Sequence, residues 1–182
     1  MTTNRNKQIS LINLSQGMPG LSSVSGAYLA EASAVCFESQ YHKNGVELQV
    51  NGSFTEKYDM FWPNATLQMF DSWNDDQVST EFGAYGVAIP IVYDLTGLMV
   101  IKRSKKGTGF DYWLGNGQNN SELPFQNAAR LEVSGIRSGN SSDIKARVKE
   151  KIEQTNPSDN LGLPAYVAVV EFSAPVTQVV KK

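Results

Sequence analysis

The stretches that decide the fold are LMVIK at residues 98–102, FDYWL at residues 110–114, ARLEV at residues 129–133 and AYVAVVEF at residues 165–172. Their β-branched and aromatic residues favour extended backbone, and the last run is apolar enough for a buried place in a sheet. Between the third and fourth runs, residues 143–155 carry Ile144, Val148 and Ile152 on one stripe, which predicts an amphipathic helix. The predicted order is three strands, a helix and a fourth strand.

A further helix is predicted immediately before the first of these strands. Either Ser79 or Thr80 can cap its start, and it ends before a Thr-Gly pair. Pro90 lies inside this helix and removes a backbone donor, so a strand over residues 87–93 is the alternative. With the helix, residues 79–172 have the order αβββαβ, which predicts an α/β fold with a mixed central sheet flanked by helices.

The first 75 residues are predicted to contain a helix, a hairpin and a short helix. These elements cover residues 26–42, residues 46–50 paired with residues 57–62, and residues 65–73. Asn51 and Gly52 favour the positive φ angles of a tight hairpin turn. We interpret residues 1–75 as an N-terminal extension that completes the sheet, forms a dimer surface or recognises a partner, and the sequence does not choose among these roles.

Length and composition predict one soluble domain over residues 1–182. No apolar run reaches the roughly 20 residues that span a bilayer, so no membrane association is expected. The single cysteine, Cys36, cannot form an internal disulfide, which is typical of a reducing compartment, and we expect a cytoplasmic protein. The net charge of −2 excludes proteins that coat nucleic acid through bulk positive charge. With a single histidine, His42, the chain has no zinc-site pattern.

Basic residues gather in two short runs in the second half of the chain. The first run is Lys102, Arg103, Lys105 and Lys106, and the second is Lys145, Arg147, Lys149 and Lys151. Each run is compatible with an ordinary solvated surface. The first run lies a few residues before Asp111, an acidic residue considered below as a site residue, and is therefore also a candidate contact for the phosphates of DNA or RNA.

The segments GTGFD at residues 107–111 and RLEVS at residues 130–134 resemble the motif of the PD-(D/E)XK, or restriction-endonuclease-like, nuclease superfamily. The resemblance covers the whole αβββαβ stretch. It implies a restriction-endonuclease-like core in which Asp111 and Glu132 hold a divalent metal ion at the edge of the sheet, with Glu81 of the preceding helix as a third ligand. The implied cofactor is Mg²⁺ or Mn²⁺, which supports hydrolysis of a phosphodiester.

The sequence departs from this motif at Ser134, where active members of the superfamily usually place a lysine. A hydroxyl cannot supply that positive charge. Arg130 lies on the same strand face as Glu132 and is one candidate replacement. Lys151 and, after it, Lys145 lie along the edges of the apolar stripe of the following helix and are the others. The structural alternative is that these helix lysines extend to solvent from the edge of that stripe.

Each candidate carboxylate also has a structural alternative. Asp111 follows a Gly-Thr-Gly turn and can hydrogen-bond the backbone of that turn. Glu132 lies in a predicted internal strand and needs a partner, which Arg130 can provide. Glu81 can be an ordinary first-turn acid favoured by the helix dipole.

Two hypotheses from different classes therefore remain open. The first is a metal-dependent nuclease, for which the resemblance implies a role in restriction or defence. The second is a catalytically inactive protein of the same fold that serves as a binding or assembly subunit for DNA or RNA, for a protein partner or for a second copy as a homodimer. Ser134 favours the second hypothesis, and the two acids Asp111 and Glu132 favour the first.

Overall fold

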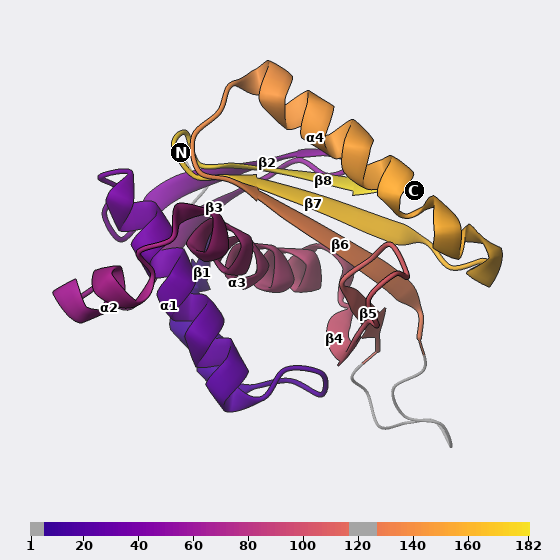
Figure 1. Cartoon of the computed structure of the whole chain (residues 1–182), viewed down its shortest axis with the longest axis horizontal. Helices are drawn as coiled ribbons and strands as arrows, with labels where there is room; N and C mark the ends of the chain where they lie inside the picture. The colour runs from indigo at the N-terminus through magenta and orange to yellow at the C-terminus, as the bar shows by residue number, and fades with distance from the viewer. Residues whose placement is uncertain (1–5, 117–126) are drawn as a thin grey trace, which may run out of the picture.

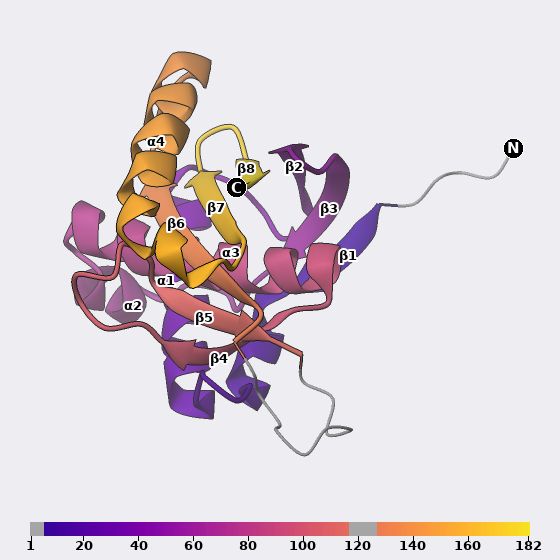
Figure 2. The ribbon, with the colours of Figure 1, turned by 90° about the vertical axis from the view of Figure 1, so that its right-hand side faces the viewer.

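One mixed sheet of eight strands runs through the part of the chain that the computed structural model describes, residues 6–116 and 127–182. Its order is β1-β3-β2-β8-β7-β6-β5-β4, and it twists strongly from β1 to β4 (Figures 1 and 2). The strands are β1 (Lys7–Ser10), β2 (Val46–Gly52), β3 (Glu56–Phe61), β4 (Met99–Arg103), β5 (Tyr112–Gly115), β6 (Ala129–Ile136), β7 (Ala165–Glu171) and β8 (Val176–Lys181).

Helices cover both faces of this sheet. They are α1 (Ser23–Ser39), α2 (Leu67–Ser72), α3 (Asp76–Thr96) and α4 (Ser141–Gln154), with 3-10 turns η1 (Leu11–Gln16) and η2 (Asn156–Leu161). The helices α1, α2 and α3 lie on one side of the sheet and α4 lies on the other (Figure 1). None of the helices within the described residues is long and apolar enough to cross a membrane.

The αβββαβ order predicted for residues 79–172 is observed as α3, β4, β5, β6, α4 and β7. The strands β4, β5 and β6 are antiparallel neighbours, whereas β6 and β7 are parallel and are joined through α4. The predicted apolar stripe of α4 packs on one face of β7, where Ile144 contacts Val167 and Val169. The opposite face of the sheet packs against α1 and α3 in the main core.

Pro90 lies inside α3, so the alternative strand over residues 87–93 is wrong. A proline in a helix interior costs about 3 kcal/mol, but α3 buries a long apolar surface against α1 and the sheet, which outweighs that cost. Close packing of the two helices depends on glycine: a Cβ at Gly86 would lie 2.6 Å from the carbonyl oxygen of Leu29 in α1. This close packing of α3 on α1 outweighs the low helix propensity of Pro90, so the segment is helical in spite of the proline.

The first 75 residues are part of the same sheet and not an appended unit. Strand β8 lies between β2 and β7, where it pairs in parallel with β2 and antiparallel with β7. The predicted hairpin is observed as β2 and β3, and β1 adds a further strand beside β3. Of the three roles considered for residues 1–75, completion of the sheet is the one that the fold shows.

Candidate active site

The Asp111 carboxylate is fixed at the start of β5 by groups from two other elements. Its backbone N–H donates to the carbonyl oxygen of Leu131 on β6 at 2.8 Å, so β5 continues its pairing up to this residue. Its Oδ1 accepts from the Tyr85 hydroxyl of α3, and its Oδ2 accepts from the Val133 N–H of β6, both at 2.9 Å. The side chain therefore does not serve the Gly-Thr-Gly turn that precedes it.

Tyr85 is suited to hold this carboxylate as a permanent donor. Burial, together with the nearby charge of Asp111, raises the pKa of the Tyr85 hydroxyl above its ordinary value. The hydroxyl keeps its proton at neutral pH and can donate it to Oδ1. Because α3 presents Tyr85 and β6 presents Val133, the position of Asp111 is set by the packing of α3 on the sheet.

Glu132 lies in the middle of β6 and is 1% exposed. Its Oε1 accepts from Lys151 Nζ at 2.8 Å and from Gln154 Nε2 at 2.9 Å, both on α4. Its Oε2 is buried and has no hydrogen-bond partner among the described residues. A buried acceptor without a donor costs about 1–3 kcal/mol, which a proton or a cation at Oε2 would relieve.

The electrostatic surroundings of Glu132 differ from those of an ordinary ion pair. Burial raises its pKa to about 8, the neighbouring Asp111 carboxylate adds to this shift, and Lys151 opposes it. Two carboxylates, one directly before β5 and one on the neighbouring β6, therefore lie together in a site with little access to solvent. Such pairs favour the uptake of positive charge, which is the property that a cation site or an acid–base site needs.

Positive charge reaches the strand from α4, at the position where Ser134 replaces the expected lysine. Lys151 contacts Glu132, as above, and Arg147 donates from Nη1 to Ser134 Oγ at 2.8 Å. The two residues are four apart in sequence and lie on one face of α4. Lys145, the other candidate, is exposed and does not line the cleft at this site.

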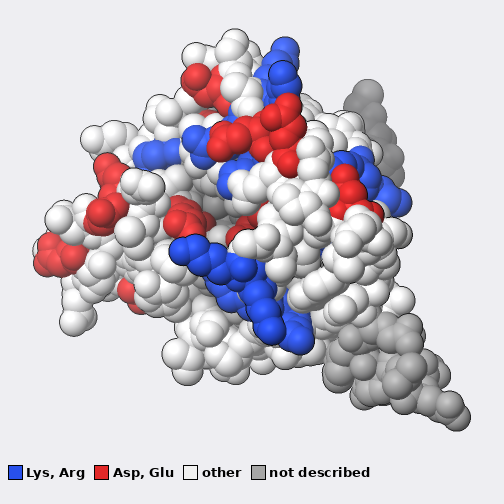
Figure 3. All heavy atoms as spheres, turned by 45° about the vertical axis from the view of Figure 1, so that its right-hand side comes forward, with Lys and Arg blue, Asp and Glu red and all other residues white. Residues whose placement is uncertain are grey.

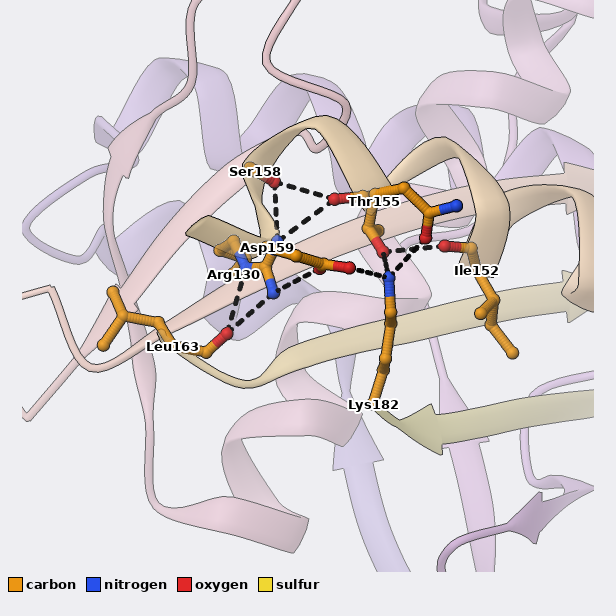
Figure 4. Close-up of polar contacts among 8 residues, drawn as sticks. Arg130, Ile152, Thr155, Ser158, Asp159, Leu163 and Lys182 are labelled. Carbon is orange, nitrogen blue, oxygen red and sulfur yellow. Dashed lines mark hydrogen bonds and ion pairs between the residues drawn. The ribbon is translucent and has the colours of Figure 1, made fainter. Parts of the chain in front are cut away.

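Arg130 has a different set of partners, and its candidate role as a cationic helper is not supported. Its guanidinium donates to Ser158 Oγ at 2.6 Å, to the Leu163 carbonyl oxygen at 2.7 Å and to the Thr155 carbonyl oxygen and Asp159 Oδ1 at 3.2 Å (Figure 4). These acceptors belong to the end of α4, to η2 and to the segment before β7. Arg130 lies at the start of β6, close to these acceptors, and its guanidinium donates its hydrogen bonds to them. It does not pair with Glu132.

Glu81 is exposed on α3 and lines the same cleft as Asp111 and Glu132. Within residues 6–116 and 127–182, however, no three or more His, Cys, Asp or Glu side chains are grouped closely enough to hold a metal ion. The structure thus brings Glu81 to the cleft without placing it in a three-ligand group. Its role as a third ligand stays a prediction.

The cleft has a volume of about 770 Å³. Its lining contains the three predicted site carboxylates Glu81, Asp111 and Glu132, two further acids, Asp76 and Glu150, and three cations, Arg137, Arg147 and Lys151. Figure 3 shows a hollow on this face with acidic atoms inside it and Lys and Arg atoms on two of its sides. A groove of this charge pattern can hold a cation on its floor and anionic groups along its walls.

The basic run at the end of β4 is exposed, and one of its members connects to the site. Lys102, Lys105 and Lys106 are exposed. The Arg103 guanidinium lies 5.5 Å from the Tyr85 ring centroid and 5.2 Å from that of Tyr112. It also donates from Nη1 to the Tyr112 hydroxyl at 3.0 Å, so its plane is held in one orientation.

Four residues of the site were not singled out from the sequence: Tyr85, Arg137, Arg147 and Gln154. Helical spacing contains a signal for most of them. Tyr85 follows Glu81 by one turn on α3, and Arg147, Lys151 and Gln154 are spaced as i, i+4 and i+7 on α4. Arg137 follows the end of β6, where its guanidinium is held by the Thr80 and Ser39 hydroxyls at 3.0 and 2.8 Å. No local pattern identifies it.

Comparisons of the chain with protein-family models, with curated proteins and with solved structures gave no match. The function is therefore inferred from the residues of the cleft. Its central features are the fixed Asp111 carboxylate, the half-paired Glu132 carboxylate and the Lys151 ammonium that reaches it from α4.

Proposed function

We propose that this protein is a metal-dependent nuclease with a restriction-endonuclease-like core, which hydrolyses nucleic acid phosphodiesters. Asp111 and Glu132 hold a divalent cation, and Lys151 supplies the positive charge that Ser134 lacks. The observation that carries the proposal is the contact of Lys151 with Glu132 at 2.8 Å, beside an Asp111 that is fixed on the neighbouring strand. In this proposal, Lys151 of α4 replaces the lysine that the resemblance implies at position 134 of β6.

The order of elements supports the proposal. The resemblance implies an acid near the start of one strand and a second acid on the next strand of an αβββαβ unit. Asp111 directly precedes β5 and Glu132 lies within β6, its antiparallel neighbour. Both acids line one cleft, together with residues of α3 and α4.

The donor set fits Mg²⁺ or Mn²⁺. Both are oxygen-preferring cations, and Mg²⁺ is commonly held by one or two carboxylates, with water and substrate phosphate completing its shell. Asp111 and Glu132 provide two carboxylates, and Glu132 Oε2 is a buried acceptor without a donor among the described residues. When bound, the cation would neutralise charge on the scissile phosphate and promote ionisation of water.

Two basic residues of the cleft, Lys151 and Arg147, have roles that do not depend on a bound metal ion. Lys151 keeps Glu132 oriented through Oε1 and leaves Oε2 free. An ammonium group has three donors, and the one that Glu132 and Gln154 do not engage can orient a water or a phosphate oxygen. Arg147, held at Ser134, places a second cation on the same wall, and a guanidinium suits phosphate oxygens.

The inactive alternative has one specific observation in its favour. The Lys151 ammonium is already paired with Glu132 and Gln154, and a lysine used in this way holds the carboxylate in place of a metal ion. A protein of this kind would bind nucleic acid or a partner without cleaving. It would show no cleavage with Mg²⁺ or Mn²⁺, and binding would survive the loss of Asp111.

Cleavage of end-labelled DNA and RNA with Mg²⁺, with Mn²⁺ and with EDTA tests the proposal. We expect cleavage by the wild type only with a divalent cation, its loss in Asp111→Asn, and its retention in Glu153→Gln, which removes an exposed acid of α4 outside the cleft. Cleavage that persists in Asp111→Asn would assign the activity to another site or to a contaminant. A folded wild type that cleaves neither substrate with either cation would contradict the proposal.

A further inference from the structure

A second pocket lies next to the cleft, between the start of α1, the first half of α3 and the β4–β5 edge of the sheet. Its volume is about 350 Å³, within the range of pockets that hold small ligands. Its walls include Leu21, Val24, Tyr28, Phe82, Arg103 and Tyr112. The lining is therefore mainly apolar and aromatic, with one guanidinium.

The apolar surface of this pocket is open to solvent. Tyr28 is 48% exposed and Val24 is 81% exposed, although both are large apolar side chains. The Tyr28 ring is nevertheless held in place, because its centroid lies 4.4 Å from that of Trp73 and 5.4 Å from that of Phe82. A fixed aromatic surface that remains exposed inside a concave site is a platform on which a flat ligand can stack.

A chain of aromatic contacts connects the pocket to the carboxylate site. Phe82 packs against Tyr85, whose ring also meets the Tyr112 ring edge-on with centroids 5.5 Å apart. Arg103 lies over the rings of Tyr85 and Tyr112, and the Tyr85 hydroxyl holds Asp111. A ligand that contacts Arg103 in the pocket is therefore one aromatic ring away from the residues proposed to hold the cation.

The charge around the pocket matches a phosphodiester chain. Arg103 is fixed at its wall through the Tyr112 hydroxyl, and Lys102, Lys105 and Lys106 are exposed along the same turn. An apolar slot beside fixed positive charge is the combination that binds single-stranded nucleic acid, where aromatic rings stack on bases and cations follow the backbone. A paired base in a duplex does not expose its faces and cannot enter such a slot without unstacking.

We infer that this pocket receives an unpaired nucleobase of the substrate strand, stacked on Tyr28, while the adjoining phosphates pass Arg103 towards the carboxylate cleft. The inference rests on the proposed nuclease function and names its substrate class: single-stranded DNA or RNA, or a strand with an unpaired nucleotide near the cleaved bond. Stacking on an aromatic ring tolerates any base, so the pocket selects unpaired structure and not sequence.

Binding of fluorescein-labelled oligonucleotides in EDTA, followed by fluorescence anisotropy, tests the pocket separately from cleavage. The probes are a single-stranded DNA, an RNA of the same sequence, the corresponding DNA duplex, and a series of single strands with one abasic site each. We expect the wild type to bind the single strands more tightly than the duplex. Tyr28→Ala should weaken single-strand binding about 5-fold or more, the loss typical of one base–aromatic stack.

The abasic series gives the sharper result. One abasic position should weaken binding to the wild type by a factor similar to that of Tyr28→Ala, and the same position should have no further effect in Tyr28→Ala. Comparison of the DNA and RNA probes identifies which nucleic acid the protein prefers. If Tyr28→Ala and every abasic position leave binding unchanged, the pocket is not a base site.

A second pair of variants guards against a folding effect of Tyr28→Ala. Val24→Asp places a negative charge at the exposed mouth of the pocket and should weaken single-strand binding, whereas Leu67→Asp at the 85% exposed Leu67 of α2 should not. Tyr93→Ala is the matched aromatic control, since Tyr93 is 46% exposed and lies outside the pocket. Equal losses in Val24→Asp and Leu67→Asp would overturn the assignment.

The two proposals fail in different ways. Metal-dependent cleavage that is lost in Asp111→Asn but unaffected by Tyr28→Ala and Val24→Asp leaves the nuclease standing and overturns the pocket. Stacking at Tyr28 without any metal-dependent cleavage supports the pocket as a binding site and overturns the nuclease. A wild type that binds none of the single strands overturns the pocket.

Discussion

Two buried ionisable side chains, two residues apart on β6, have opposite surroundings. All three guanidinium nitrogens of Arg130 donate hydrogen bonds, to carbonyl and side-chain oxygens of the α4–β7 connection. Glu132 has one carboxylate oxygen paired with α4 and the other buried without a donor among the described residues. A buried ionisable group whose hydrogen bonds are all formed is compatible with a stable fold. One that keeps an oxygen without a donor lowers the stability, and that cost needs an explanation.

Arg130→Ala should have the largest effect on stability. Removing the guanidinium leaves the Leu163 carbonyl group without its side-chain donor and Asp159 without its buried partner, and should lower the free energy of unfolding by about 3–5 kcal/mol. Urea unfolding measures this change. Arg130→Lys should recover little, because an ammonium cannot reach the same spread of acceptors. A loss below about 1 kcal/mol would show that this network is not structural.

Lys151→Met should affect activity more than stability. If Lys151 takes the role that Ser134 cannot fill, metal-dependent cleavage should fall about 100-fold or more, the usual contribution of a positioned acid–base group. Lys145→Met, an exposed lysine on the same helix, is the control and should change the rate less than about twofold. Equal rates for Lys151→Met and the wild type would remove Lys151 from the proposed chemistry.

The pH dependence of stability distinguishes Glu132 from Arg130. The folded-state pKa of Glu132 is about 8, above its ordinary value of 4.5, so the folded protein holds an extra proton between these pH values. The stability that this proton provides is complete below pH 4.5 and is lost as the pH rises through about 8. Relative to Glu132→Gln, metal-free wild type should lose up to about 1.4 kcal/mol per pH unit in this window.

Denaturant midpoints of the two proteins from pH 5 to pH 9 provide this measurement. The difference between wild type and Glu132→Gln isolates one carboxyl group, because the other titrating groups are common to both. Parallel pH profiles would show that Glu132 titrates normally and would remove the electrostatic basis for a cation at Oε2.

Lys182→Ala should have the smallest effect. Lys182 Nζ lies 2.6 Å from Asp159 Oδ2 at the outer side of the Arg130 network (Figure 4). The Asp159 side chain is 44% exposed, so solvent screens the pair and its loss should cost no more than about 1 kcal/mol. A loss as large as that of Arg130→Ala, again by urea unfolding, would mean that the network depends on its outer ion pair.

The sequence predicted the second half of the fold better than its ends. Periodicity identified α4 and β7 because their apolar residues repeat in the patterns of a helix and of a buried strand. The strands β1 and β8 were missed: β1 is a polar run of four residues, and β8 lies between β2 and β7 through pairing that no local pattern shows. The position of β8 is also the reason that residues 1–75 are not an extension.

The candidate site was predicted in part. Alternation along β6 predicts that Arg130, Glu132 and Ser134 share one face. It does not predict that the Arg130 guanidinium donates to carbonyl groups of the α4–β7 connection. Helical spacing favoured Lys151, and the structure places its ammonium on Glu132. The partners of Asp111 come from elements that are distant in sequence, so only the packed structure reveals them.

Isothermal titration of the metal-free protein with Mn²⁺ tests most directly whether Asp111 and the half-paired Glu132 hold a cation. Titrations at pH 7 in buffers of different ionisation enthalpy count the protons released on binding. We predict binding at one site with release of about one proton, from Glu132, and no binding by Asp111→Asn. Absence of binding by the wild type, or equal binding by Asp111→Asn, would contradict this prediction.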